Sequence, residues 1–151
     1  MMMPKPSLFA EEERGNRRSK LGDPLVGLSK HVDFGALADE IDTALPRPSR
    51  AKGGRPPYPT VLMTKILVLQ QLYNLADDAL EYQLLDRRSF LQFLGLTESS
   101  TIPDAKTIWL FRDRLGSLVR HIGAIADAVY LATGGYALNL TALGTPLPAQ
   151  K

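Results

Sequence analysis

Positive charge gathers in a stretch of the chain rich in proline and glycine, and the chemistry of such a stretch is phosphate binding. Between Asp42 and Asp77 the sequence has basic residues but no carboxylate. The segment 53–59 reads GGRPPYP, in which glycines allow rotation and prolines hold the chain extended. We therefore expect residues 46–57 to form a basic arm that presents Arg55 to a polyanion. A solvated linker is the alternative interpretation. The basic residues of the interval are Arg47, Arg50, Lys52, Arg55 and Lys65.

Carboxylates close in sequence suggest a metal site, since helical spacing would place Asp77 and Glu81 on one face. Helix capping is the favoured interpretation, because Asp77 suits an N-cap and Asp78 suits the first turn, where the helix dipole stabilises negative charge. Neither His31 nor His121 stands in a nucleophile motif. We therefore expect no metal site, no cofactor and no catalytic residue.

Composition narrows the class of protein. The 151 residues suffice for one ordinary domain, and 44% hydrophobic residues can supply a core. There is no cysteine, which excludes disulfides and zinc fingers. No apolar run approaches the roughly 20 residues of a membrane helix, and no signal peptide is evident. We expect a cytoplasmic protein without membrane contact.

The sequence of the amino-terminal part predicts short helices. Residues 1–24 are rich in charge and are expected to be mobile, with at most a transient helix over residues 9–14. A short amphipathic helix is expected to begin at Pro24, and Asp33 is suited to cap another. Together these patterns place the start of a folded helical domain at about residue 25.

Two further helices are predicted after the arm. Residues 60–74 carry a broad apolar stripe, which is typical of a central helix. Residues 78–88 predict a shorter helix with Leu85 inward and Glu81 outward. A compact helical turn then ends at Gly95.

The strongest periodicity lies near the carboxyl end. From Asp104, apolar residues recur every three or four positions as far as Val129, which predicts one long helix ended by Gly134-Gly135. A coiled-coil pair is the alternative. A basic face with one indole beside this stripe fits either nucleic-acid binding or a solvated surface. The stripe is Ile108, Phe111, Leu115, Leu118, Ile122, Ile125 and Val129.

The last residues are expected to be held loosely. Residues 136–143 alternate like one strand, but a strand without a partner leaves its edges unpaired. The predicted fold is therefore all-α: a compact helical domain over residues 25–132, with a helix-turn-helix-like group, one long C-terminal helix and a loose tail over residues 133–151.

Six short motifs follow one another in a fixed order: Gly54 to Pro59, Leu72 to Asp78, Glu81-Tyr82-Gln83, Asp86 to Phe90, Phe93 to Leu96 and Pro103 to Arg112. Taken together, they resemble the N-terminal domain of bacterial insertion-sequence transposases of the insertion-sequence-five type. The resemblance covers residues 25–132.

The resemblance implies that this helical domain binds the terminal inverted repeats of the element. It also implies a following RNase H-like domain, whose Asp-Asp-Glu carboxylates hold two metal ions for strand transfer. After the long helix, the sequence departs from the Asp-Asp-Glu pattern that such a catalytic domain requires. Asp127 is the last carboxylate, and Asn139-Leu140-Thr141 stands where an Asp-x-Thr pattern would begin. We expect a transposase truncated before its catalytic domain, and hence no enzyme.

Two functions are carried forward. The first is binding of double-stranded DNA, with the helix that opens at Asp104 approaching the major groove and the arm along the backbone or minor groove. The second is a protein-interaction or dimerisation module that associates with itself or with a full-length transposase through the long helix. A degenerate fragment without function is a third interpretation. The expected DNA contacts are Arg55, Lys65, Lys106, Thr107, Trp109, Arg112, Arg114 and Arg120.

Overall fold

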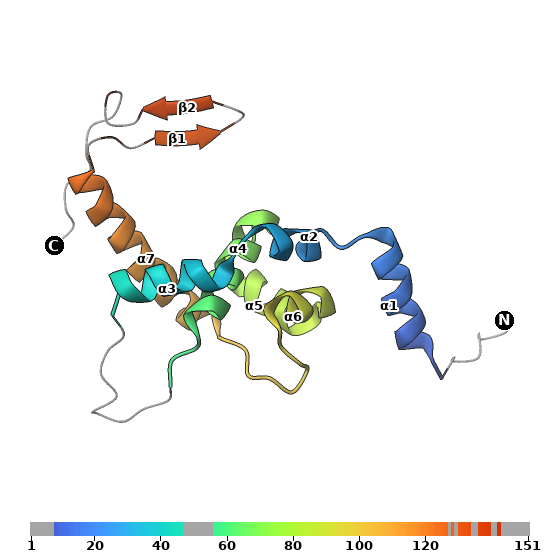
Figure 1. Cartoon of the computed structure of the whole chain (residues 1–151). Helices are drawn as coiled ribbons and strands as arrows, with labels where there is room; N and C mark the ends of the chain where they lie inside the picture. Colours follow the sequence, from blue (N-terminus) through green and yellow to red (C-terminus); the bar gives the residue numbers. More distant parts are fainter. Residues whose placement is uncertain are drawn as a thin grey trace.

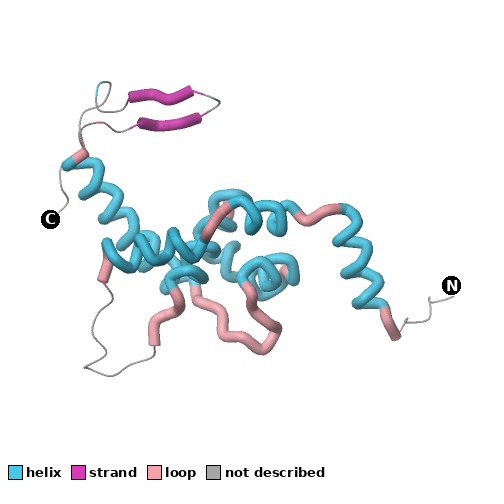
Figure 2. Tube along the Cα trace, in the orientation of Figure 1, coloured by secondary structure: helices cyan, strands magenta, loops and turns pink. Residues whose placement is uncertain are grey.

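The protein is a helical body with a β-hairpin at its carboxyl end (Figures 1 and 2). The computed structural model describes residues 8–46, 56–126, 128, 130–133, 136–139 and 142. Figure 1 shows α1 at one end of the molecule and the second half of α7, with the hairpin, at the other. The elements are α1 (Ala10–Leu21), α2 (Pro24–His31), α3 (Phe34–Ala44), α4 (Thr60–Tyr73), α5 (Asp77–Asp86), α6 (Arg88–Leu94), α7 (Ala105–Ile125), β1 (Tyr130–Thr133) and β2 (Tyr136–Asn139).

The core forms around α4, whose broad apolar stripe was predicted to be central. Ile66 and Leu69 have no exposed surface. Helix α3 packs along α4, while α6 and the first half of α7 also contact it. The all-α prediction is confirmed for this body. The buried cluster is Leu25, Phe34, Leu62, Met63, Ile66, Leu69, Leu80, Leu84, Phe90, Phe93, Leu94 and Ile108.

Helix ends follow local sequence signals. The Asp33 carboxylate accepts the Ala36 N–H at 3.0 Å, so the predicted cap of α3 is confirmed. Helix α6 ends at Gly95, whose φ of 72° lies in the left-handed region that glycine adopts without strain. Asn74 takes the same region at the end of α4 and opens a three-residue turn into α5. Helix α7 packs against both of the helices that this turn joins.

Two predictions about α5 are wrong. The helix begins one residue earlier than predicted and ends at Asp86. Leu85 points outward with 63% of its surface exposed, since the buried face is filled by Leu80 and Leu84. The first helix also differs from expectation: α1 spans twelve residues instead of six, yet none of its residues is buried.

The long helix α7 is shorter than its periodicity predicted. It ends at Ile125, and the chain forms a strand from Tyr130 onward. The predicted lone strand therefore has a partner, because β1 and β2 pair antiparallel with Thr133 opposite Tyr136. The Gly134-Gly135 dipeptide between them is a hairpin signal, which we interpreted as a helix end instead. Val129 lies outside the described residues.

The two halves of α7 differ in burial. Ile108, in the first half, has no exposed surface, whereas Val119 and Ile122 expose 62% and 50% of theirs. The apolar stripe thus continues past the body that covers its beginning. Within the described residues, no helix is long and apolar enough to cross a bilayer.

This difference gives a matched pair of substitutions. Ile108→Ala removes fully buried methyl groups and should lower the free energy of unfolding by about 2–5 kcal/mol. Ile122→Ala makes the same chemical change on the same helix at a half-exposed site and should cost less than about 1 kcal/mol. Urea denaturation of dilute protein measures both. Equal losses would contradict the assigned packing of α7.

Candidate nucleic-acid interface

A polar network joins three helices beside the core. The Arg112 guanidinium of α7 donates to both oxygens of Asp77 on α5, at 2.5 and 2.9 Å. It also donates to the Gln70 side chain of α4 at 3.1 Å, and the Gln70 amide in turn donates to Asp77 at 2.7 Å. Gln70 is only 4% exposed. Arg112, predicted to contact DNA, thus faces a carboxylate on a neighbouring helix.

The network changes the role of Asp77. Hydrogen bonds from Arg112 and Gln70 hold the pKa of the Asp77 carboxyl below its usual value. Asp77 is the first residue of α5, and the cap position belongs to Ala76, so the predicted N-cap is wrong. Its carboxylate turns toward α7 because a bidentate arginine gives it stronger hydrogen bonds than backbone N–H groups would.

Glu81 also faces α7, where its carboxylate accepts the Ala105 N–H at 2.7 Å. The outward position predicted for it is therefore wrong. Both carboxylates of the suspected metal pair are engaged with the protein itself. In the part of the chain that the structure describes, no three acidic or histidine side chains come close enough to share a metal ion.

Lys65 is also held by the body. Its ammonium donates to the Phe93 carbonyl at 3.0 Å and lies 5.5 and 5.2 Å from the ring centroids of Phe34 and Phe93. Phe93 stands in the last turn of α6, where carbonyls lack partners within the helix. The side chain of Lys65 therefore ties α4 to α6 and α3.

The outer face of α7 carries the other predicted contacts. Lys106, Trp109 and Arg120 are exposed, and Trp109 shows 47% of its surface. At 100° per residue these positions share one side of the helix. Asp113, which our prediction omitted, falls on the same side and subtracts from its positive charge. Arg120 lies near its own helix, where it donates to the Ser117 hydroxyl at 2.9 Å.

Thr107 stands in the first turn of α7 and is half-buried. Its N–H is accepted by the Asp104 carboxylate at 2.7 Å, which confirms that the helix opens where predicted.

One end of the basic arm meets α7, and the other end meets the loop that precedes α7. The Arg114 guanidinium donates to the Pro46 carbonyl at 3.2 Å. On the other side of the arm, the Tyr58 hydroxyl donates to the Ile102 carbonyl at 3.1 Å. A cavity of about 130 Å³ lies between the two ends, and Arg55 itself lies outside the described residues. The cavity is lined by Ile41, Asp42, Leu45, Pro57, Tyr58, Thr60, Phe111 and Arg114.

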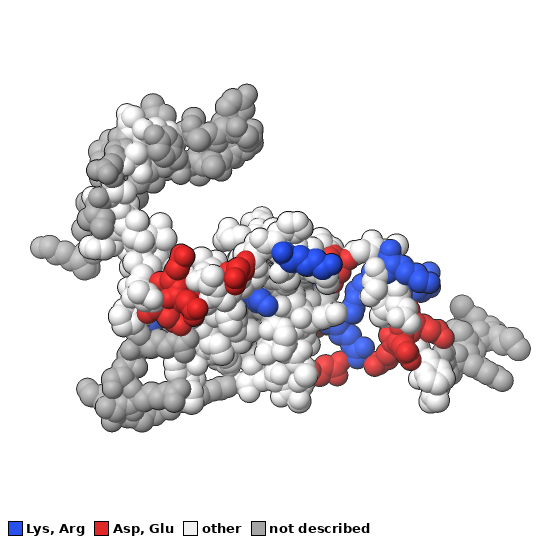
Figure 3. All heavy atoms as spheres, viewed as in Figure 1, with Lys and Arg blue, Asp and Glu red and all other residues white. Residues whose placement is uncertain are grey.

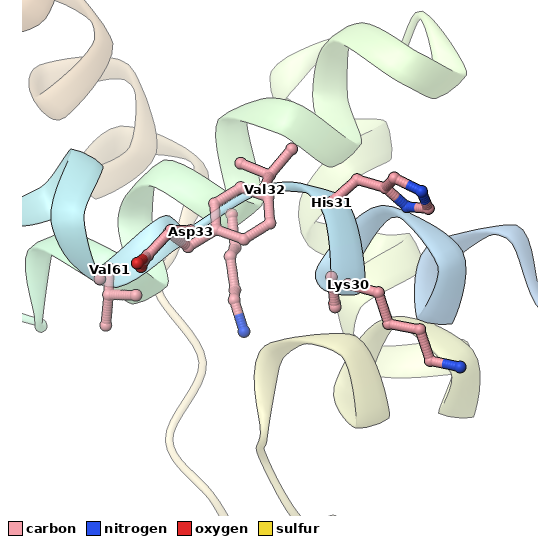
Figure 4. A pocket seen from close by; sticks show the side chains of 9 residues that line it. Lys30, His31, Val32, Asp33 and Val61 are labelled. Carbon is pink, nitrogen blue, oxygen red and sulfur yellow. The ribbon is translucent and has the colours of Figure 1, made fainter.

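An open hollow of about 490 Å³ lies where the turn from α2 to α3 passes α4 (Figure 4). Lys30 and His31 extend on the opposite side of the hollow from Asp33 and Val61. Two of its polar groups are already engaged: the His31 Nδ1 is 2.8 Å from the Gly27 carbonyl, and Asp33 caps α3. The hollow therefore brings no convergent set of reactive groups together.

The charges of α5 and α7 decide which of these two helices is suited to face DNA. Helix α5 contains Asp77, Asp78, Glu81 and Asp86 but no Lys or Arg, so it is unsuited to lie in a DNA groove. On the face that Figure 3 shows, acidic side chains gather over the α3 end, while basic and acidic ones mix around α1. Of α5 and α7, only α7 carries basic side chains and is suited to face a phosphate backbone.

Comparison with known proteins identifies one family. Its family model, described as "Transposase domain (DUF772)", matches residues 12–114, which is more than half of the chain. The match runs from α1 into the first half of α7 and ends at Arg114. No solved structure matches the chain significantly.

The network beside the core makes a pH-dependent prediction. Asp77→Asn should lower the free energy of unfolding by about 1 kcal/mol at pH 7, because it weakens a half-exposed, charge-assisted pair. A carboxyl whose folded-state pKa is depressed contributes stability above its unfolded pKa, near 4, and loses it as the pH falls through the folded value. The gap between wild type and variant should therefore shrink below about pH 4.

Asp78→Asn is the matched control, since it removes the same charge from the same turn at an exposed site. Urea titrations of the three proteins between pH 7 and pH 3 provide the measurement. A cost at Asp78 equal to that at Asp77, or a gap independent of pH, would contradict the network's role.

Proposed function

We propose, since the chain belongs to the family of transposase domains, that it binds double-stranded DNA at the terminal inverted repeats of an insertion sequence. The family membership places the chain in transposition-related biology. The narrower assignment, to the N-terminal domain of insertion-sequence-five transposases, is supported by the order of motifs between Gly54 and Arg112.

The observation that carries the proposal is that residues at the two ends of the basic arm, Pro46 and Tyr58, lie close to α7. Residues 47–55 contain four basic side chains and no acidic one. Pro46 and Tyr58, which flank this arm, lie beside α7 at Arg114 and Phe111. Four positive charges are thereby tethered within reach of the helix that bears Lys106 and Trp109. Such tethering raises the local density of cations that a phosphate backbone attracts.

The predicted contacts divide into two roles. We assign Arg55, Lys106, Thr107, Trp109, Arg114 and Arg120 to the DNA surface. Lys65 and Arg112 are positioning residues instead, because their charged groups bind the Phe93 carbonyl and the Asp77 carboxylate. They act on DNA only through the placement of α4 and α7.

We also propose that these residues perform no strand transfer. The chemistry implied by the resemblance requires three carboxylates around two metal ions. Asp77 and Glu81, the pair best spaced to begin such a site, are bound to Arg112 and to the Ala105 N–H. Metal binding would have to break both contacts.

A second function, association through α7, is favoured by the exposed apolar side chains of its second half. Val119 and Ile122 are largely exposed, next to half-buried Leu115 and Leu118. Apolar surface of this kind is typical of interaction sites. The partner would be a second copy of the chain or a full-length transposase.

Removing one phosphate contact should reduce the slope of log affinity against log salt by about 0.9. We expect this loss for Lys106→Ala and for Arg55→Ala, measured by fluorescence anisotropy on an inverted-repeat duplex and a scrambled one. Arg55→Ala should weaken both duplexes alike. Lys30→Ala, an equal charge change at an exposed site on α2, should leave the slope nearly unchanged. Absence of wild-type binding at low salt would refute the proposal.

For association, Ile122→Glu should shift the sedimentation equilibrium toward monomer, because it places a charge in the exposed apolar stripe. Ala124→Glu introduces the same charge at an exposed position on the other side of α7 and should have little effect. A wild-type chain that stays monomeric, alone and with a full-length transposase, would count against this second function.

A further inference from the structure

The hydrogen bonds and ion pairs described between helix α1 and the body are made by polar and charged side chains. None of the helix residues is buried, so apolar packing contributes little to its position. Its charges are segregated: Glu11, Glu12 and Glu13 occupy the first turn, and Arg18 and Lys20 the last. A helix of this kind depends on its electrostatic contacts for its place.

Two of these contacts link α1 to α6, and one of them shares its arginine with a glutamate of the loop that follows α6. The Arg88 guanidinium, at the start of α6, lies 2.9 Å from a Glu11 oxygen and 2.8 Å from a Glu98 oxygen. Further along α1, Arg18 donates to the Gln92 side chain at 2.9 Å. The side chains of Arg88, Glu11 and Glu98 expose 52%, 70% and 72% of their surface. Figure 3 shows basic and acidic side chains adjoining in this region.

The arginine is held more firmly than the glutamate that binds it. Helix α6 buries Phe90, Leu91, Phe93 and Leu94, which fixes the backbone of Arg88. Its neighbour Arg87 lies 5.5 and 5.1 Å from the ring centroids of Tyr73 and Phe90. Two arginines are thus anchored on the body, while the carboxylate of Glu11 comes from a helix without apolar anchorage.

A guanidinium fork binds carboxylate and phosphate oxygens with the same geometry. Exposed ion pairs of this sort are weak and are screened by salt. A phosphate oxygen of DNA would therefore compete with Glu11 for Arg88 at little energetic cost.

We propose that Glu11 is an intramolecular substitute for DNA phosphate on Arg88, so that α1, through its acidic first turn, is a strap which DNA displaces. The proposal rests on the proposed DNA-binding function and adds a second contact to it. That contact lies at the end of the body opposite the second half of α7 (Figure 1). Glu11 and DNA phosphate cannot bind Arg88 at the same time. The apparent affinity of the protein for DNA therefore falls in proportion to the fraction of molecules in which Glu11 occupies Arg88.

The test compares two variants with equal charge. Glu11→Gln and Glu12→Gln each remove one negative charge from the same turn, so their general effect on DNA attraction is equal. We expect Glu11→Gln to bind a duplex roughly two- to fivefold more tightly than Glu12→Gln, the range that an exposed ion pair allows. In an Arg88→Gln background this advantage should vanish. Equal affinities of the two variants, or an advantage that persists without Arg88, would overturn the strap.

A second measurement does not depend on DNA binding. Since the chain has no cysteine, spin labels can be placed at Asn16→Cys on α1 and Gln71→Cys on α4, both exposed. Glu11→Gln should broaden the distance distribution between them without DNA, and a duplex should broaden it in the otherwise unchanged chain. An unchanged distribution in Glu11→Gln overturns the strap. If no variant binds DNA, the proposed function and the displacement of α1 by DNA are both overturned. If Glu11→Gln still broadens the distribution in that case, the contact of Glu11 with Arg88 stands.

Discussion

The rotation of α7 about its own axis is fixed by Arg112, and the surfaces of the molecule follow from that rotation. The guanidinium donates to Asp77 and Gln70 on two other helices, so turning α7 would break all of these hydrogen bonds and leave only the one between Gln70 and Asp77. With Arg112 turned inward, Lys106 and Trp109 point outward. The same rotation places Arg114 beside Pro46, where the basic arm begins.

The network supplies orientation, whereas apolar burial supplies most of the stability. Complete burial of one Ile or Leu side chain contributes about 1.5–3 kcal/mol, and Ile66, Leu69, Leu80, Leu84 and Ile108 are all fully buried. A half-exposed ion pair contributes about 1 kcal/mol or less. Apolar contacts tolerate rotation of a helix better than a bidentate pair does, because they lack direction. The two kinds of contact therefore have separate tasks.

Local signals in the sequence predicted much of the fold. Asp33 caps a helix, the long helix opens at Asp104 and another helix ends at Gly95, all as expected, because each of these effects depends on residues within one turn. The extent of α7 was overestimated, since an apolar repeat continues to Val129 while the helix stops at Ile125. Periodicity alone does not distinguish the covered part of a stripe from an exposed one. The alternation over residues 136–143 and the Gly-Gly dipeptide before it were the signals for the hairpin.

The candidate site was predictable by residue type but only partly by role. Lys65 and Arg112 are basic residues on helices, as DNA contacts often are. Their partners, Phe93 and Asp77, lie 28 and 35 positions away in the sequence, so no local pattern links them. Long basic side chains have the reach to bind either solvent-borne phosphate or a distant group of their own chain. Only the packing of the helices decides between these outcomes.

The continuity of α7 beyond the family match limits how its second half can be oriented. The match stops at Arg114, in the middle of a helix that continues without a break to Ile125. A continuous helix transmits rotation, because each turn is hydrogen-bonded to the next. The direction in which Val119 and Ile122 point is therefore set by Arg112 in the first half. A partner bound to the second half would be oriented by the same network that turns Lys106 outward. The contacts of Arg112 with Asp77 and Gln70 would then fix the directions of both the DNA surface and the association surface of α7.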